Sequence, residues 1–135
     1  MKFLVDANVL SEATRSDPDQ AVVEWLRQHE QSIAVDPIVL GEIRFGINLL
    51  PKSRRRSILE KWFDEGVSRI VCLPWDAATG IRWAKLLADL RLSGHSMPVK
   101  DSMIAATALQ HGLTVATRNV KDFKKAGLDV IDPFA

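Results

Sequence analysis

The sequence predicts an α/β fold built on a mainly parallel sheet. Short apolar runs of strand length recur as KFLV, SIAV, RIVCLP, LTVAT and LDVI, and longer stretches with helical spacing lie between them. Strands that alternate with helices favour parallel neighbours, because a parallel crossover needs a long connection, usually a helix. We therefore expect a central sheet of about five strands with helices on both faces.

Length and composition fit one domain over residues 1–135. A chain of this size with 47% hydrophobic residues can bury a core of its own. The formal net charge is +1, so any contact with nucleic acid must come from a local patch rather than from a globally basic surface.

The cysteine count and the apolar runs bear on location. Cys72 is the single cysteine, which excludes an internal disulfide and favours a reducing compartment. Because Cys72 lies in the apolar run RIVCLP, we expect it in the core. No apolar run reaches the roughly 18 residues that a membrane span needs, so we expect a cytoplasmic protein with no membrane partner.

Five helices follow from capping residues and apolar spacing. The best defined begins with Asp36 as N-cap and Pro37 at the first helical position, directly after the second strand. Asp17 and Pro18 repeat that pattern. The predicted helices span residues 17–30, 36–50, 53–66, 76–94 and 101–112, and the last three end at glycines.

Acidic and polar side chains stand at the boundaries of these elements. Asp6 follows the first strand, at the edge where open α/β sheets bind ligands. Asp101 opens the helix over 101–112, and Asn119 closes the fourth strand. Glu42 lies in a largely apolar helix, where a charged side chain is rarely buried unless it is paired or binds a cation.

A divalent metal ion would explain this set. Taken singly, Asp6, Asp101 and Asn119 could serve only loops, caps and turns. Carboxylates brought together raise one another's pKa unless a cation balances them. With oxygen ligands and no cysteine or histidine at ligand spacing, Mg²⁺ or Mn²⁺ are the expected ions.

Three segments carry a resemblance to a known family: LVDANVLSE, VLGEIRFGI and KDSMIAATALQHGLTVATRNVKDF. They resemble the PIN-domain family and, within it, the VapC and FitB type of toxin ribonuclease from bacterial type II toxin–antitoxin pairs. The resemblance covers almost the whole chain, and its third segment is the most specific. It implies a three-layer α/β/α fold and metal-dependent hydrolysis of RNA phosphodiester bonds.

The resemblance also assigns roles to residues. Asp6 and Asp101 correspond to ligands of the main ion, and Glu42 to a ligand that positions or deprotonates water. The fourth family position falls on Asn119, often an aspartate in relatives, so a second ion would bind more weakly unless Asp122 partly replaces it. Short polar side chains suited either to supporting the carboxylates or to turns and caps are Asn8, Ser11 and Thr117.

The same resemblance implies an antitoxin partner that neutralises the enzyme, with a basic side chain placed in the acidic cleft. The helix over 76–94 has a wide apolar surface, which predicts a homodimer and a docking groove. The residues of that surface are Ile81, Trp83, Leu86, Leu87 and Leu90.

Two alternatives remain open at this stage. A haloacid-dehalogenase-like phosphatase also begins with an aspartate at a strand end, but Asn8 stands where that motif needs its second aspartate. A catalytically weak PIN-like module that only binds RNA or a partner is compatible with the loss of a carboxylate at Asn119.

Overall fold

The computed structural model describes residues 1–135 and is built around one parallel sheet. Its five strands follow the order β3-β2-β1-β4-β5. The strands are β1 (Phe3–Val5), β2 (Ile33–Val35), β3 (Val71–Cys72), β4 (Thr114–Ala116) and β5 (Val130–Ile131). The predicted α/β class, strand number and parallel direction are confirmed.

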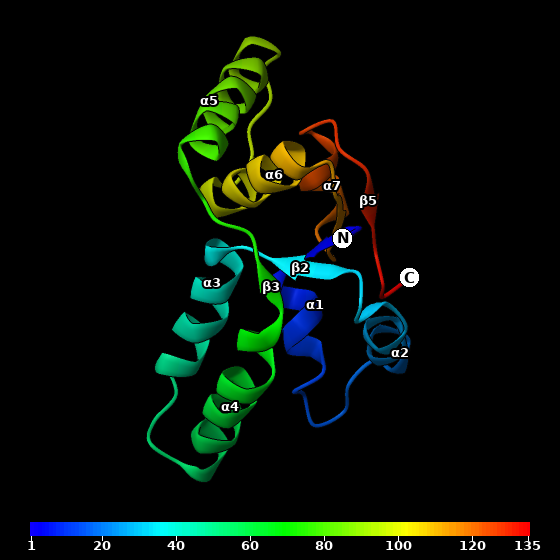
Figure 1. The fold of residues 1–135 in the computed structure, drawn as a ribbon, viewed down its shortest axis with the longest axis vertical. Coiled ribbons are helices and arrows are strands. Elements are labelled where there is room, and N and C mark those ends of the chain that lie inside the picture. The colour runs from blue at the N-terminus through cyan, green and yellow to red at the C-terminus, as the bar shows by residue number, and fades with distance from the viewer.

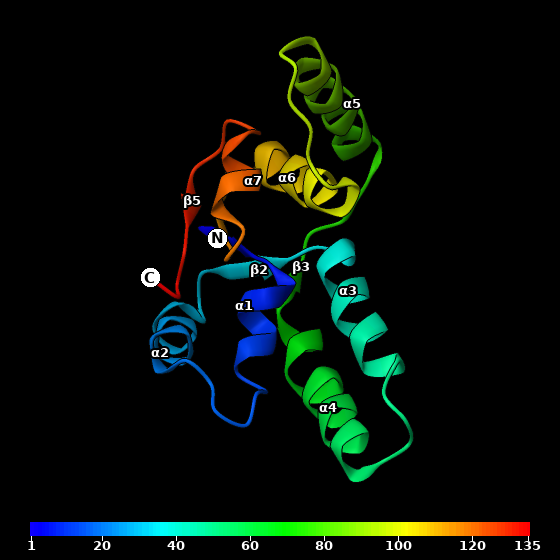
Figure 2. The same ribbon diagram turned by 180° about the vertical axis from the view of Figure 1, so that it is seen from behind.

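Helices cover both faces of this sheet, which gives three layers (Figure 1). In that view α6 and α7 lie on one side, and α1, α3 and α4 lie on the other. α5 packs on α6 and projects from the body, as the reverse view also shows (Figure 2). The helices are α1 (Ala7–Glu12), α2 (Gln20–His29), α3 (Pro37–Asn48), α4 (Arg54–Glu65), α5 (Ala77–Leu92), α6 (Val99–His111) and α7 (Val120–Lys124), with a 3-10 turn at Val67–Arg69. No helix has the length and apolar content that crossing a membrane requires.

Strand register brings polar residues to one edge of the sheet. Leu4 of β1 pairs with Ala34 of β2 on one side and with Val115 of β4 on the other. The residue that directly follows each of these strands is Asp6, Asp36 or Thr117. Because the strands are parallel, their carboxyl ends meet at the same edge. All three of these polar residues are buried there.

Two short helices, α1 and α7, are absent from the sequence prediction. Each begins directly after a residue that had been interpreted as the end of a strand, Asp6 and Asn119. Helices this short gain their stability from packing rather than from propensity. Val9 and Leu10 of α1, and Phe123 of α7, are buried in the core, which accounts for both helices.

Several local predictions need correction. Cys72 is exposed rather than buried, because β3 is an edge strand that pairs only with β2. Asp19, not Asp17, caps α2 by accepting a hydrogen bond from the backbone of Ala21 at 2.9 Å. α6 begins at Val99, so Asp101 lies within its first turn rather than at its start.

Candidate metal centre

Asp6 is held rigidly between the ends of β1 and β4. Its Oδ1 accepts the backbone N–H of Ala7 at 2.8 Å, which caps α1. Its Oδ2 accepts the Thr117 hydroxyl at 2.7 Å and the Asn8 side-chain amide at 3.3 Å. Burial raises the pKa of Asp6 above its ordinary value, although these three hydrogen bonds act in the opposite direction.

Asn8 and Thr117 continue this network across the sheet edge. The Asn8 amide also approaches the Thr117 hydroxyl at 3.4 Å, and the Asn8 Oδ1 accepts the backbone N–H of Arg118 at 3.2 Å. The two residues therefore fix the orientation of the Asp6 carboxylate. Ser11, suited either to supporting the carboxylates or to a turn or cap, makes no side-chain hydrogen bond to them; it lies further along α1 and lines a groove.

Glu42 projects from α3 toward the same edge. Its Oε1 is buried and has no hydrogen-bond partner, and its Oε2 lies 3.9 Å from the Lys100 Nζ. Burial raises the pKa of Glu42, and the charges of Asp6 and Asp101 raise it further. A buried oxygen without a partner is unfavourable and is free to accept a proton or bind a cation.

Glu42 also separates two grooves. One, of about 370 Å³, lies between α1, α3 and α4, and Asn8, Ser11 and Trp62 contribute to its walls. The other, of about 410 Å³, lies between α3 and the start of α6, where Lys100 lines it. Glu42 therefore lines a groove on each side of α3.

Asp101 lies in the first turn of α6 and is 9% exposed. Burial, followed by the charges of Asp6 and Asp122, raises the pKa of Asp101 to about 6, while Lys100 lowers it. Asp6, Glu42 and Asp101 thus come from three separate elements and influence one another electrostatically. The tertiary fold brings three carboxylates that lie far apart in the sequence within electrostatic range of one another.

Comparison with known proteins identifies the family of the chain. Residues 3–128 match the family model described as the PIN domain. The chain belongs to the PIN-domain family.

Individual relatives match this PIN domain over nearly its full length. A protein of Sinorhizobium fredii named VapC ribonuclease Y4jK is 36% identical over 98% of this chain and 97% of its own. Toxin FitB of Neisseria gonorrhoeae is 31% identical over 98% of both chains. A solved structure of FitAB bound to a DNA fragment superposes with a TM-score of 0.92 at 30% identity, covering 98% of this chain and 96% of the other.

Asn119 and Asp122 are connected to the carboxylate cluster in different ways. Asn119 is exposed, and its side chain makes no capping hydrogen bond at the start of α7. Its backbone N–H donates to the Thr117 hydroxyl at 3.0 Å, which connects it to Asp6 through one intermediate. Asp122 pairs with the Lys125 Nζ at 3.6 Å and still raises the pKa of Asp101. The negative charge contributed by this segment therefore comes from Asp122.

Two further residues were not identified as part of the site from the sequence. Asp36 was predicted only as the cap of α3, yet it is fully buried and its charge acts on Glu42. Lys100 supplies the positive charge beside the cluster and lowers the pKa of Asp6, Glu42 and Asp101. The sequence signal for Asp36 is its position directly after a strand, which it shares with Asp6.

The residues of this PIN domain fit a divalent cation by their chemistry. No three of the chain's acidic, histidine or cysteine side chains stand close enough in this structure to hold an ion among them. The carboxylates nevertheless raise one another's pKa, and the Glu42 Oε1 lacks a partner. A hard cation would relieve both conditions, because carboxylate oxygens are its preferred ligands.

Proposed function

We propose that this PIN domain is a metal-dependent ribonuclease toxin of a toxin–antitoxin pair, which hydrolyses RNA phosphodiester bonds with Mg²⁺ or Mn²⁺. One observation carries the proposal: the Oε1 of Glu42 is buried without a hydrogen-bond partner, and the charges of two other buried carboxylates, Asp6 and Asp101, raise the pKa of Glu42. The full-length similarity to a VapC ribonuclease and to toxin FitB supports the reaction and the biological class.

The proposal assigns a different role to each side chain of the site. Asp6 and Asp101 would hold the ion, and Asn8 and Thr117 keep the Asp6 carboxylate oriented through their hydrogen bonds. When bound, the ion would act as a Lewis acid that neutralises phosphate charge and lowers the pKa of a water molecule. Glu42 would receive the proton at its unpartnered Oε1, and burial, which raises the pKa of Glu42, makes this carboxylate a stronger base than an exposed one.

Asn119 limits the second metal position in the same proposal. An amide oxygen can bind a cation but brings no negative charge, so a second ion would bind more weakly than the first. Asp122 supplies part of the missing charge from the following turn, where its effect on the pKa of Asp101 supports this assignment.

The proposed partners are RNA, an antitoxin and a second copy of the chain. An antitoxin would place a basic side chain against the acidic cluster, where a cation can replace the charge of the metal. Ile81 and Leu92 on α5 are 74% and 87% exposed, and they favour a homodimer contact on the projecting helix. Leu86 and Leu90, by contrast, are buried against the rest of the chain. We place this complex in the cytoplasm.

Cleavage of total RNA by the purified protein tests the function. Mg²⁺ and Mn²⁺ are titrated, EDTA is the control, and Glu42→Gln is the matched variant because it keeps the shape of the side chain and removes its basic oxygen. We expect cleavage that depends on the ion and falls steeply in Glu42→Gln. Cleavage that persists in EDTA would overturn the mechanism, and RNA binding without cleavage by the wild type would identify a binding module.

The phosphatase alternative receives no support from the geometry. The residue two positions after Asp6 is Asn8, and its side-chain amide donates to the Asp6 carboxylate. A phosphatase of that class needs a carboxyl group there to exchange protons with the substrate. Asn8 instead fixes a ligand, which suits a metal site.

A further inference from the structure

Asp36 is a fully buried carboxylate that the roles above do not use. It follows β2 as Asp6 follows β1, and these strands pair side by side. Its two oxygens have different partners. Oδ1 accepts the backbone N–H of Val39 at 2.9 Å and caps α3, whereas Oδ2 accepts the Thr107 hydroxyl at 2.7 Å. Thr107 belongs to α6 and is itself fully buried.

This one side chain therefore connects the two helices that carry active carboxylates. α3 holds Glu42, and α6 holds Asp101. A hydrogen bond between two buried groups permits little variation in geometry, because leaving either group unpaired is unfavourable. A serine at position 36 could cap α3, but its single short oxygen could not also reach across to α6. A carboxylate can accept from both helices at once.

We propose that the Asp36–Thr107 hydrogen bond is a clamp that sets the position of α3 against α6 and so presents Glu42 and Asp101 to the same divalent ion. Asp36 is a positioning residue and not a ligand, since both of its oxygens are already bonded within the protein. This inference rests on the proposed function, because it assumes that Glu42 and Asp101 share an ion.

The chain contains a natural control for this clamp. Asp76 caps α5, and its Oδ1 accepts both the backbone N–H and the hydroxyl of Thr79, at 3.0 Å and 2.9 Å. Thr79 is fully buried, as Thr107 is. The residue types and the cap are the same, but this pair lies within one helix end. It connects no two elements and carries none of the candidate ligands.

Binding of Mn²⁺ to the full chain, measured by calorimetric titration, tests the clamp without reference to activity. Thr107→Val removes the hydroxyl at nearly constant volume, and Thr107→Ser keeps it. We expect Thr107→Val to bind Mn²⁺ about tenfold more weakly, the usual size of effect for a group that orients a ligand. Thr107→Ser should remain within about twofold of the wild type. Thr79→Val should lower the unfolding temperature yet leave Mn²⁺ affinity unchanged.

Several outcomes would overturn the clamp. One is Mn²⁺ affinity in Thr107→Val equal to that of the wild type. Another is a loss of Mn²⁺ affinity in Thr79→Val as large as that in Thr107→Val, which would reveal a general effect of destabilisation. Should Thr107→Val not fold, Asp36→Ser replaces it, since that variant retains the cap of α3 and loses the reach to α6. Unchanged affinity in Asp36→Ser would count against the clamp equally.

A parallel variant separates this inference from the proposed function. Asp101→Ala removes a ligand itself. If Asp101→Ala binds Mn²⁺ as well as the wild type does, the metal site is wrong and the clamp falls with it. If Asp101→Ala loses binding while Thr107→Val retains it, the metal site stands and only the clamp is wrong.

Discussion

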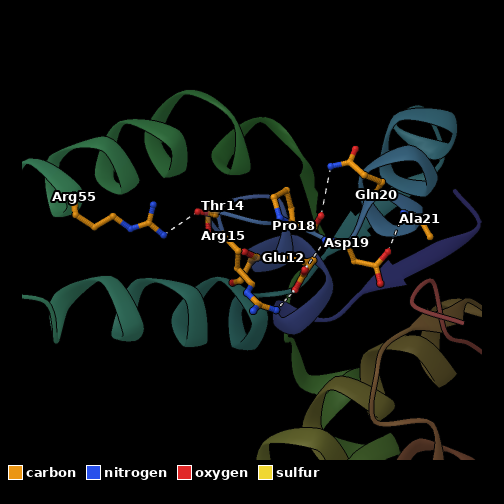
Figure 3. Close-up of polar contacts among 9 residues, drawn as sticks. Glu12, Thr14, Arg15, Pro18, Asp19, Gln20, Ala21 and Arg55 are labelled. Atoms are coloured by element: carbon orange, nitrogen blue, oxygen red, sulfur yellow. Dashed lines mark hydrogen bonds and ion pairs between the residues drawn. The ribbon is translucent and has the colours of Figure 1, made fainter.

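The two ends of α1 carry buried carboxylates whose pKa values are shifted in opposite directions. Asp6 is 3% exposed and Glu12 is 5% exposed. Glu12 accepts the backbone N–H of Asp19 at 2.7 Å and the Arg15 guanidinium at 3.2 Å (Figure 3). These partners hold the pKa of Glu12 below its ordinary value, whereas burial holds the pKa of Asp6 above its own.

The difference lies in which influence on the carboxylate is largest: burial for Asp6, and the hydrogen bond from the backbone N–H of Asp19 for Glu12. Asp6 receives three hydrogen bonds, all from neutral donors, and the charge of Lys100, which is not bonded to it, lowers its pKa less than burial raises it. Glu12 has an arginine of its own. A buried carboxylate with a bonded cation completes a local structure, here the loop after α1. One that lacks such a cation is prepared to bind an ion.

The largest expected effect is on RNA cleavage, which should depend on Asp6 and not on Glu12. Asp6→Ala should abolish cleavage of RNA, with a loss beyond the roughly 10–100-fold that follows removal of an outer partner of a metal ligand. Glu12→Gln should retain cleavage, because it lies outside the metal centre. Cleavage rates at saturating Mg²⁺, with circular dichroism to verify folding, measure both. Full cleavage activity in Asp6→Ala would show that Asp6, like Glu12, is not needed for the reaction.

The change of folding stability with pH should have opposite signs for Asp101 and Glu12. The pKa of Asp101 rises from 3.8 to about 6 in the folded protein, so the folded state binds its proton more tightly than the unfolded state does. In EDTA, stability should therefore fall as pH rises from about 4 to 6. Asp101→Asn should flatten this fall and be more stable at pH 7.5 by roughly 1–2 kcal/mol, allowing for solvent screening. Urea unfolding curves provide the measurement.

Glu12 should show the reverse dependence. Its pKa is lowered on folding, so its contribution to stability is present above its unfolded pKa and is lost as pH falls through the folded value. Glu12→Gln should thus be less stable than the wild type at neutral pH, and the two should converge in acid. Parallel urea curves at pH 7 and pH 3 test this. A gap that widens in acid would contradict the role given to Arg15.

At position 119 a carboxylate can be added to the cluster or the amide can be removed. Asn119→Asp should tighten binding of a second divalent ion, because it adds a carboxylate at the family's fourth acidic position. Asn119→Ala should reduce cleavage by no more than about tenfold, far less than Asp6→Ala. Mn²⁺ titration gives the number and affinity of the ions. One unchanged class of site in Asn119→Asp would exclude this position from metal binding.

The smallest effect is expected in the loop beside Glu12. The Arg55 guanidinium of α4 donates to the backbone carbonyl of Thr14 at 2.8 Å (Figure 3). Arg55→Ala should lower stability by about 0.5–1 kcal/mol, since an exposed carbonyl can bond water instead. Hydrogen exchange of the amides over residues 13–19 should rise while cleavage stays unchanged. Exchange at the wild-type rate would show that Glu12 alone orders the loop.

Local sequence patterns predict the class of the fold and point to the three candidate carboxylates. Alternating apolar runs and capped helices predicted the parallel sheet, because burial and capping are properties of local sequence. Asp36 and Pro37 predicted the start of α3, and the structure confirms it. Glu42 stood out because a charge among apolar residues has few structural explanations.

Which polar groups meet depends on the packing of elements that are distant in the chain. Asp36 looks like any helix cap in the sequence, and only the pairing of β1 with β2 and the packing of α6 bring it to Thr107. Cys72 looks like a core residue, and only its place on an edge strand exposes it. Contacts between residues distant in the chain depend on strand order, which local sequence patterns do not encode. The roles of Asp6, Glu12 and Asp36 therefore became distinct only when their partners were known.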